Sequence, residues 1–574
     1  MHEPAAATDI IAAIRANVIG EDEAVVGPFG LRRVTYADYT ASGRSVAFIE
    51  DFIREAVLPL YGNTHTESSG TGLQTTRFRE DARRIIRDAV GATAADHVVL
   101  FAGSGSTGAI DKLIDCLEIR LPADLDARYD LRARIPAAER PVVFIGPYEH
   151  HSNELPWRES LADLIVIPED HDGRIDVSAL ERALAAHVDR PLKIGSFSAA
   201  SNVTGLLTDT RSISILLHRH GALSFWDYAA AAPYVSIAMG PFATGETDPL
   251  AYHDAIFISP HKFIGGPGTP GVLVARRELF KNSVPSIPGG GTVAYVNPTE
   301  HRYLSEIEHR EEGGTPAIVE SIRAGLVFSL KASVGTEAIR EREESFIHRA
   351  IDRWSRHPEI EILGNPALDR LSIVSFVVRL SSTDGTRRYL HHNFVVALLN
   401  DLFGIQARGG CSCAGPYGHR LLGIDLDRSH EFEREIGRGS EGIKPGWIRV
   451  SFNYFISEAV FDFILAAVEF VATDGWRLLP QYGFEPRSGL WRHSSGTADP
   501  PLSLHDVSFD GGAMRWPAHR RTEPESRLAD YLEEARAIVT SEPSPGSAPE
   551  HLVLDGDFEA LRWFPLPDEI VSQG

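Results

Sequence analysis

Cysteine is scarce in this sequence, in which only Cys116, Cys411 and Cys413 occur among 574 residues. Three thiols cannot form a disulfide framework, and few cysteines are typical of a reducing compartment, so we expect a cytoplasmic protein. The N-terminus has no basic stretch followed by an apolar one, and no window approaches the ~18 apolar residues of a membrane-spanning helix. We therefore expect neither a signal peptide nor a transmembrane helix.

Positive charge is also in short supply. The chain has 56 Lys and Arg against 79 Asp and Glu, a net charge of −23. A nucleic-acid-binding surface needs positive patches that replace counterions, and anionic membranes attract basic segments, so neither partner is expected. Hydrophobic residues make up 43% of the chain, as in ordinary globular proteins, and this length allows a large buried core.

Short apolar runs alternate with helical segments in the first half of the chain. The runs are HVVLFAG, VVFIG, LIVIP, LKIGSFSA, ALSFWDYA, AIFISP and GVLVAR, and residues 178–187 and 210–220 are among the helical segments between them. Strands separated by helices imply an α/β fold with a mostly parallel sheet covered on both faces. We expect an N-terminal segment (1–74) that contributes to a small domain, a large domain (75–315), a smaller α+β domain (316–475) and a C-terminal extension (476–574).

The extension from residue 476 onward differs in composition from the rest. It is rich in Pro, Gly, Ser and Arg, and it carries four tryptophans: Trp476, Trp491, Trp516 and Trp563. Tryptophan contributes a large apolar surface, so we expect the extension to pack on the body of the protein or on a partner.

The run Ser259-Pro260-His261-Lys262 places a lysine where an apolar strand ends, beside the glycine-rich segment 263–268. Open α/β sheets bind ligands at this edge. A lysine whose amine is partly deprotonated there can form an imine with an aldehyde. A single lysine after a strand is more often a solvated cation, so the interpretation depends on the three segments that follow.

Three other segments carry chemically useful groups at or just after the end of a predicted strand. Asp227 comes at the end of an apolar strand, where its carboxylate either keeps a cofactor ring nitrogen protonated or caps a helix. The turn 103–107 can offer backbone N–H groups and hydroxyls to a phosphate. His150 can stack on a flat ring and move protons. A metal at His150 and His151 is disfavoured because adjacent side chains point apart.

Six motifs occur in the order EHHSN, SNVTG, WDYAAAAP, SPHKFIGG, GGTP and RGGCSCAGP. Over residues 35–475 this set resembles the class V aminotransferase superfamily of fold-type I pyridoxal 5′-phosphate (PLP) enzymes, and within it the cysteine desulfurases and selenocysteine lyases. The resemblance implies a large domain with a mostly parallel sheet of the seven-stranded type and PLP as cofactor. It also implies a homodimer, cleavage of the C–S or C–Se bond of cysteine or selenocysteine to give alanine, and a possible sulfur-acceptor protein.

The resemblance also implies the residue roles. Lys262 would hold PLP as a Schiff base and carry the proton, His150 would stack on the ring, and Asp227 would pair with the ring nitrogen. The remaining cofactor contacts would come from Asn202 to the phenolic oxygen, from Ser106, Thr107, Ser259 and His261 to the phosphate, and from Thr315 to the phosphate in the neighbouring subunit. Arg408 and Arg449 would hold the substrate carboxylate, a task suited to a planar guanidinium.

Two of the three cysteines lie in one glycine-rich loop. By resemblance Cys413 would take the substrate sulfur as a persulfide, and the nearby Arg408 would favour its thiolate. Cys411 would be a resolving thiol that accepts sulfur or forms a disulfide with Cys413. Two buried apolar thiols are the plain alternative. Zinc bound by this pair and His419 would lack a fourth ligand, so no metal site is expected.

The chain departs from the family pattern beside Asp227. Ala230 stands where desulfurases usually carry a glutamine that bonds the phenolic oxygen, and Tyr228, which replaces a usual glycine, would be a substitute donor. The insertion 418–445 and the C-terminal extension have no counterpart in the minimal family form. These differences leave another class V enzyme as the alternative, namely an aminotransferase, an epimerase or a C–S lyase without a persulfide. An accessory sulfur- or metal-binding protein on a degenerate fold is a third hypothesis.

Overall fold

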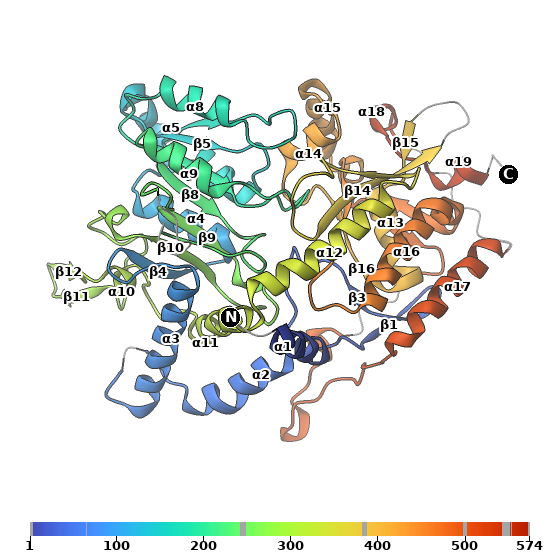
Figure 1. Ribbon diagram of the computed structural model, residues 1–574, viewed down its shortest axis with the longest axis horizontal. Helices are drawn as coiled ribbons and strands as arrows, with labels where there is room; N and C mark the ends of the chain where they lie inside the picture. The colour runs from blue at the N-terminus through green and yellow to red at the C-terminus, as the bar shows by residue number, and fades with distance from the viewer. Residues whose placement is uncertain are drawn as a thin grey trace. The chain divides into compact units, whose positions relative to one another are not determined.

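The computed structural model describes residues 4–64, 66–240, 248–381, 387–496, 502–541, 552 and 554–571. The chain forms two compact units (Figure 1). Unit 1 comprises Met1–Ile19, Tyr39–Arg342 and Ala367–Leu371, and unit 2 comprises Gly20–Asp38, Glu343–Pro366 and Ser372–Gly574. The first 74 residues therefore divide between the two units.

A seven-stranded sheet forms the centre of unit 1. Its strands, in spatial order, are β4 (His97–Ala102), β10 (Gly271–Arg276), β9 (Ala255–Ile258), β8 (Leu223–Asp227), β7 (Lys193–Ser198), β5 (Val142–Ile145) and β6 (Asp163–Val166). The strands from β9 to β6 are parallel, and β10 runs antiparallel to both of its neighbours. Each strand coincides with one of the predicted apolar runs, which confirms the α/β fold.

Helices cover both faces of this sheet, and that burial explains why the strands read as continuous apolar runs. Phe225 of β8 packs in the cluster that includes Leu113 of α4 (Gly105–Cys116). The next residue, Trp226, faces the other way, and its Nε1 donates to Ser214 of α9 (Thr210–Arg219) at 3.0 Å.

The direction of the strands decides where their loops meet. Because β10 is antiparallel to β4 and to β9, these two strands run the same way as each other. The carboxyl ends of β4, β5, β7, β8 and β9 therefore all lie at one edge of the sheet. That edge is where open α/β sheets bind their ligands.

Two long helices of unit 1 pack along each other. Gly325 of α11 (Ile318–Val334) approaches Ala82 of α3 (Gly70–Ala89) so closely that a Cβ on Gly325 would lie 2.6 Å from the Ala82 Cα. Glycine is therefore required at this crossing. The other segments of unit 1 used below are α1 (Pro4–Asn17), α2 (Ala47–Phe52), α10 (Ile307–Arg310) and the hairpin of β11 (Val293–Val296) and β12 (His301–Tyr303).

Unit 2 has its own antiparallel sheet and core. Its strands are β13 (Ile360–Ile362), β14 (Ile373–Ser381), β18 (Trp447–Ser451) and β17 (Arg408–Gly410), with β15 (Arg387–Tyr389) paired to β14. Buried residues of α13 (His392–Phe403) and α16 (Glu458–Asp474) complete the core. Among the described residues, no helix has both the length and the apolar character needed to cross a membrane.

The C-terminal extension belongs to unit 2. Its elements are β19 (Tyr482–Glu485), β20 (Leu490–His493), α17 (Leu528–Thr540), α18 (Gly556–Leu561) and α19 (Pro567–Val571). Trp491 is buried in the core of unit 2, and Trp476 and Trp563 pack against it, which confirms that the extension packs on the body. Trp516, by contrast, is 57% exposed in an irregular segment and does not pack on the body.

Candidate active site

The predicted lysine sits in a single helical turn directly after β9. The Lys262 N–H donates to the carbonyl of Ser259 at 3.1 Å. The following glycine segment folds back on this turn, because a Cβ on Gly266 would lie 2.1 Å from the carbonyl oxygen of Pro260. The glycine-rich sequence is therefore what allows the backbone to close tightly around the lysine.

Asp227 ends β8, the strand beside β9, and is 4% exposed. Burial raises the pKa of its carboxyl, while the N–H of Ala229, the charge of Lys262 and the Ser106 hydroxyl oppose that rise. The Ala229 N–H donates to Asp227 Oδ1 at 2.9 Å. A buried carboxylate, a lysine and a serine from three different loops therefore interact at one edge of the sheet.

The turn 103–107 meets the lysine turn. The Ser106 N–H donates to Ser259 Oγ at 2.8 Å. Gly105 has a φ of +56°, and a Cβ there would lie 2.8 Å from Ser259 Oγ and 3.5 Å from His261 Nε2, so only glycine fits. Burial, assisted by the charge of Lys262, lowers the pKa of His261 to about 4. A neutral imidazole and two serines therefore converge at the start of α4.

The turn that carries His150 joins the same group. The Ser152 N–H donates to Nδ1 of His150 at 3.1 Å, which leaves the ring proton on Nε2 in the neutral imidazole. The Ser152 hydroxyl lies 2.6 Å from that of Thr107. Asn202, which follows β7, is 8% exposed. The sheet edge thus gathers the predicted segments around Lys262, Asp227, His150 and Asn202 and the turn 103–107. Thr315 lies in another loop of unit 1, where its hydroxyl accepts from Asn63 Nδ2 at 3.4 Å.

Glu149 is a buried residue of this region that sequence reasoning missed. Its carboxylate accepts four hydrogen bonds, from Gly146 N–H (3.1 Å), Ser198 N–H (3.0 Å), Ser198 Oγ (2.6 Å) and Asn153 Nδ2 (2.7 Å). Burial raises its pKa to about 7 against these hydrogen bonds. Glu149 joins the ends of β5 and β7 next to His150, so it fixes the backbone that carries the imidazole.

The residues beside Asp227 do not replace the missing glutamine. The Tyr228 hydroxyl lies 3.3 Å from Nε2 of His253 and 3.5 Å from the hydroxyl of Thr210, and burial raises its pKa to about 12. The interpretation of Tyr228 as a substitute donor is therefore wrong, because its hydroxyl is engaged by α9 and the chain before β9. Lys331 of α11 supports this loop instead, donating to the carbonyls of Ala232 and Val235 at 2.6 and 2.5 Å.

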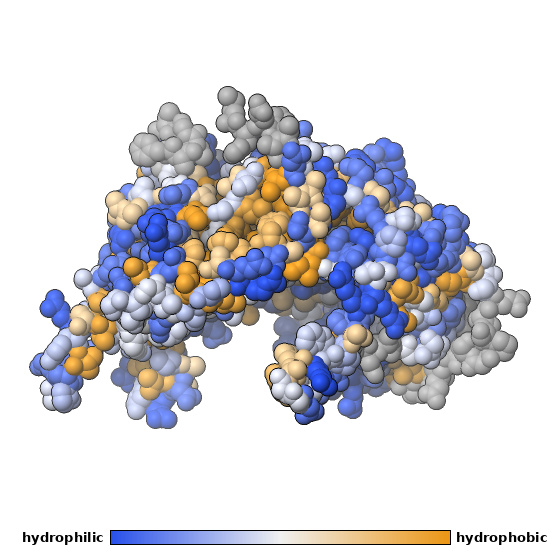
Figure 2. Space-filling model, turned by 90° about the horizontal axis from the view of Figure 1, so that it is seen from below, coloured by the Kyte–Doolittle hydropathy of each residue, from blue (hydrophilic) through white to orange (hydrophobic). Residues whose placement is uncertain are grey.

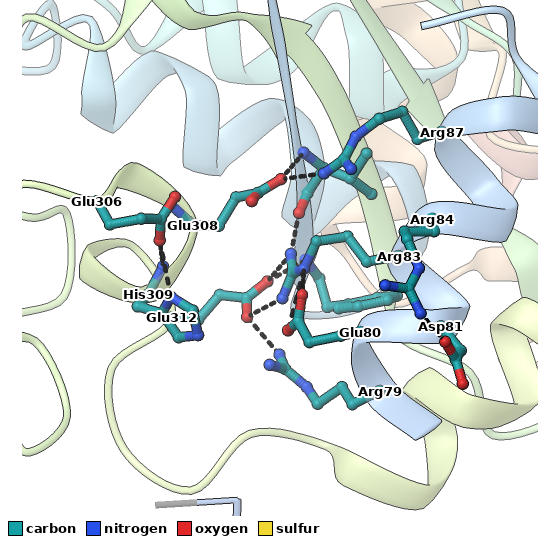
Figure 3. A network of polar contacts seen from close by, with 12 residues as sticks. Arg79, Glu80, Asp81, Arg83, Arg84, Arg87, Glu306, Glu308, His309 and Glu312 are labelled. Atoms are coloured by element: carbon teal, nitrogen blue, oxygen red, sulfur yellow. Dashed lines mark hydrogen bonds and ion pairs between the residues drawn. The ribbon is translucent and has the colours of Figure 1, made fainter. Parts of the chain in front are cut away.

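A second group that sequence reasoning missed covers the outer edge of β4. Arg79 and Arg83 of α3 pair with the buried carboxylate of Glu312, and Arg87 pairs with Glu308 of α10 (Figure 3). Burial alone would raise the pKa of Glu312, but the charges of Arg83 and Arg79 prevail and lower it to about 2.

The same two carboxylates satisfy the edge of the strand itself. Glu308 accepts from the N–H of Val99 at 2.9 Å, and Glu312 accepts from the N–H of Phe101 at 2.7 Å. Edge strands expose unpaired N–H groups that other chains could pair with, and here these groups are occupied. Glu312 also immediately precedes Gly313-Gly314-Thr315, so it connects the end of β4 to the loop that carries Thr315.

The predicted substrate arginines lie in unit 2 and face each other across paired strands. Arg408 of β17 is in register with Arg449 of β18. Both donate to Asp38, Arg449 at 2.8 Å and Arg408 at 3.0 Å. Burial lowers the pKa of Arg449, and the Asp38 carboxylate opposes that shift. Two cations share one anion, so the group keeps a net positive charge that suits a carboxylate ligand.

The cysteines of this unit occupy a tight turn. Cys413 is exposed and Cys411 is partly exposed, whereas Cys116 of unit 1 is buried. Within the part of the chain that the structure describes, no three His, Cys, Asp or Glu side chains gather closely enough to hold a metal ion.

Comparison with known proteins identifies similar sequences. The model of the family "Aminotransferase class-V" matches residues 35–459. The chain is 26% identical over 391 residues to a probable cysteine desulfurase of Halalkalibacterium halodurans, covering 67% of this chain and 84% of the relative. It is 25% identical to a cysteine desulfurase of Escherichia coli, covering 67% and 85%.

Solved structures show the same fold. A cysteine desulfurase from Thermococcus onnurineus superposes with a TM-score of 0.61 at 22% identity, covering 82% of this chain and 98% of that one. The cysteine desulfurase CsdA from Escherichia coli gives a TM-score of 0.56 at 21% identity, with coverage of 76% and 93%. Each alignment covers most of the relative's length but leaves part of this chain unmatched.

Proposed function

Because the chain belongs to the class-V aminotransferase family, we propose that it is a PLP-dependent cysteine desulfurase-like enzyme that converts cysteine or selenocysteine to alanine. Its relatives in Halalkalibacterium halodurans and Escherichia coli are named as cysteine desulfurases, one of them as probable. The observation that carries the proposal is the convergence of Lys262, buried Asp227 and the Ser106–Ser259 contact at the ligand edge of the sheet.

The residues at this edge fit PLP. Gly105 lets the start of α4 approach Ser259 and His261 closely, because a Cβ there would lie 2.8 Å from Ser259 Oγ, and this brings together N–H and hydroxyl groups of the kind that bind a phosphate. Lys262 supplies an amine for a Schiff base, and the buried Asp227 carboxylate holds a proton on the ring nitrogen. Bound in this way, PLP acts as an electron sink for negative charge at the substrate α-carbon.

The other unit 1 residues position the cofactor and move the proton. His150, with its proton on Nε2, would stack on the ring, and Asn202 would bond the phenolic oxygen. Thr107 adds a hydroxyl to the phosphate site. Lys262 would carry the proton to and from the substrate α-carbon, because its amine is a base positioned at the ligand edge.

Arg408 and Arg449 bind the carboxylate of the small amino-acid substrate, and Cys413 acts on its sulfur. The thiolate of Cys413 attacks that sulfur, and a bond between the two sulfur atoms forms while the bond from the substrate β-carbon to sulfur breaks. The β-carbon keeps the electron pair and takes up a proton, so alanine is released and a sulfur-acceptor protein can collect the sulfur left on Cys413. The exposure of Cys413 supports this role, because a persulfide must be reached by its acceptor. All three cysteines are free thiols, in keeping with a cytoplasmic location.

A homodimer is part of the proposal, with Thr315 reaching the phosphate in the neighbouring subunit. The segment from α2 to the start of α3 carries exposed apolar side chains, among them Leu58 (49%), Leu60 (49%) and Tyr61 (45%). Figure 2, viewed from the side on which α2 and α3 lie in Figure 1, shows hydrophobic residues gathered on that face. An apolar patch of this kind supports contact with a second copy.

Ala230 keeps a second candidate function open. Without the usual glutamine, one donor to the phenolic oxygen is missing, and the Tyr228 hydroxyl is engaged elsewhere. A different class-V reaction, such as amino transfer, epimerisation or C–S cleavage to pyruvate, would tolerate that change. Identification of the products from L-cysteine separates these reactions: alanine and sulfide support desulfuration, and pyruvate and ammonia support lysis.

Borohydride reduction of the PLP-loaded protein followed by peptide mapping tests the cofactor site. We expect the pyridoxyl mass on Lys262 and on no other lysine, and we expect Lys262→Ala to lose it. In a separate experiment, unreduced PLP-loaded wild type should yield alanine from L-cysteine. The Cys413→Ala variant should form no persulfide. A pyridoxyl group on another lysine, or undiminished alanine formation in Cys413→Ala, would contradict the assignment.

A further inference from the structure

The cysteine turn is short and held at both ends by the same strand. On one side β17 pairs with β18, with Gly410 opposite Trp447. On the other side α14 (Gly415–Leu421) packs on the same tryptophan, because a Cβ on Gly418 would lie 2.5 Å from the Trp447 ring. Only residues 411–414 connect these two anchors, so the turn cannot carry Cys413 far from its position.

The backbone of the turn is unusual. The Ala414 N–H donates to the Cys411 carbonyl at 3.0 Å, and the two residues between them, Ser412 and Cys413, have φ values of +50° and +54°. A closed turn with positive φ at both central residues is of type I′, which is normally built from glycine or asparagine. The left-handed conformation is unfavourable for other residues, and such strain gathers at functional sites.

This turn holds both accessible cysteines of the chain, since Cys411 is partly exposed and Cys413 is exposed. Cys411 is its first residue and Cys413 its third, and the hydrogen bond from the Ala414 N–H to the Cys411 carbonyl folds the chain back between them. A disulfide joins Cα atoms about 4.4–6.8 Å apart, a separation that residues two apart in a closed turn can reach. Cys116, by contrast, is buried against Glu311, and burial raises its pKa. Within the described residues, sulfur held on Cys413 therefore has its nearest accessible thiol in its own turn.

We propose that Cys411 resolves the Cys413 persulfide, an inference that rests on the function proposed above. The thiolate of Cys411 attacks Sγ of Cys413, a bond forms between these two sulfur atoms, and the bond to the terminal sulfur breaks. The terminal sulfur takes the electron pair and leaves as hydrosulfide, while the two cysteines become a disulfide. A small thiol from solution then reduces this disulfide and restores both cysteines for the next turnover.

The consequence is that the enzyme can release free hydrosulfide without an acceptor protein. If the turn carried only one cysteine, its persulfide would persist until a thiol from another molecule reached it. Here the second thiol is intramolecular, and a tethered reactant has an effective concentration far above that of one free in solution. A disulfide confined to so short a turn is strained, which makes it easy for a small thiol to reduce.

A single-turnover experiment tests this step. PLP-loaded wild type is mixed under anaerobic conditions with one equivalent of L-cysteine and no reductant, and the free thiols are then blocked by alkylation. We expect one hydrosulfide per alanine formed, and a peptide spanning Cys411 and Cys413 that is two hydrogens lighter than the dithiol. Cys411→Ser should lose hydrosulfide release and keep a peptide one sulfur heavier, with the extra sulfur on Cys413. Cys116→Ala is the matched control and should behave as the wild type.

The outcomes separate this inference from the proposed function. A wild-type peptide that retains the persulfide with Cys411 alkylated would overturn the resolving role while leaving desulfuration intact. The same follows if Cys411→Ser releases hydrosulfide as fast as the wild type. If the wild type forms no alanine, or forms it without sulfur ever appearing on Cys413, the proposed function itself fails and the resolving step fails with it.

Discussion

At the scale of single residues, the burial of Glu149 makes the stability of the fold depend on pH. Its pKa of about 7 is raised above the ordinary value of a glutamate, so its stabilising contribution is fully present below that ordinary value. This contribution is lost as the pH rises through about 7, because the buried carboxyl must then ionise. The acid behind His150 thus makes the fold more sensitive to alkaline conditions than a neutral residue would.

Glu149→Gln tests this behaviour. An amide cannot ionise, although it also misplaces a donor among the four groups that Glu149 accepts from, so the variant should melt at a lower temperature than the wild type. The difference in melting temperature should be largest at about pH 5 and shrink toward about pH 8, where the wild type bears the cost of ionisation. A difference that is constant over this range would show that Glu149 does not titrate there. Calorimetry on both proteins across the pH series provides the measurement.

Arg449 and Arg408 differ in burial, and that difference predicts unequal contributions to substrate binding. The Arg449 side chain is 3% exposed and that of Arg408 is 43% exposed. A lysine at position 449 would keep the charge but lose the planar pair of donors, so we expect KM for L-cysteine to rise about tenfold or more. Arg408→Lys, the matched control on the neighbouring strand, should raise KM less, because its site is solvated. Equal effects of the two variants would contradict the assignment, and an unchanged melting temperature would show that both remain folded.

At the scale of elements, the ion-pair network beside β4 connects two segments that the proposal places at phosphates. Glu312 bonds the N–H of Phe101, two residues before the turn 103–107, and directly precedes the loop that carries Thr315. Its partners Arg79 and Arg83 hold it from α3, as Figure 3 shows. One buried carboxylate therefore sets the position of both segments.

Glu312→Gln should weaken PLP binding about tenfold, the equivalent of ~1.4 kcal/mol, because it removes one charge from a buried network and loosens both segments. Pyridoxal, which lacks the phosphate, should lose much less affinity. Glu308→Gln breaks a similar contact on the same strand edge, with Arg87 and the Val99 N–H, but lies farther from the loop. It should lower the melting temperature without the selective loss of PLP affinity. Equal losses for PLP and pyridoxal would indicate a purely structural role.

At the scale of the whole molecule, the C-terminal extension is part of the unit 2 core. Trp491 is 5% exposed, and its ring lies 5.0 Å from those of Phe394 in α13 and Phe484 in β19. Removal of the extension would therefore expose core side chains of α13. A chain cut after residue 475 is not expected to retain a folded unit 2.

Trp491→Ala and Trp516→Ala form a matched pair for this claim. Trp491→Ala, at the buried position, should lower the free energy of unfolding by about 3–5 kcal/mol, as large-to-small changes in cores do. Trp516→Ala, at the exposed position, should change the free energy of unfolding by no more than about 0.5 kcal/mol. Denaturant unfolding followed by circular dichroism measures both, and a small effect at position 491 would mean that the extension is dispensable for the core.

The sequence by itself determined the strands and the residues that end them. Strands buried on both faces require uninterrupted apolar runs. A polar residue at the carboxyl end of a strand of the parallel set lies at the ligand edge of the sheet, as Asp227 does at the end of β8 and Lys262 does in the turn after β9. Sequence also located the cysteine pair and the packing of Trp491, because rare residue types are informative wherever they occur.

Only the tertiary structure decided which distant groups meet. An apolar run does not state its direction, so the antiparallel course of β10 depended on its neighbours. The partners of Glu312 and Asp38 are far from them in the chain, so nothing in the sequence marks these acids as partners of arginines. Glu149 has two local donors, Gly146 and Asn153, but its contact with Ser198 depends on the pairing of β5 with β7. The left-handed backbone of Ser412 and Cys413 was equally hidden, since neither residue favours it and only the anchors on β18 impose it.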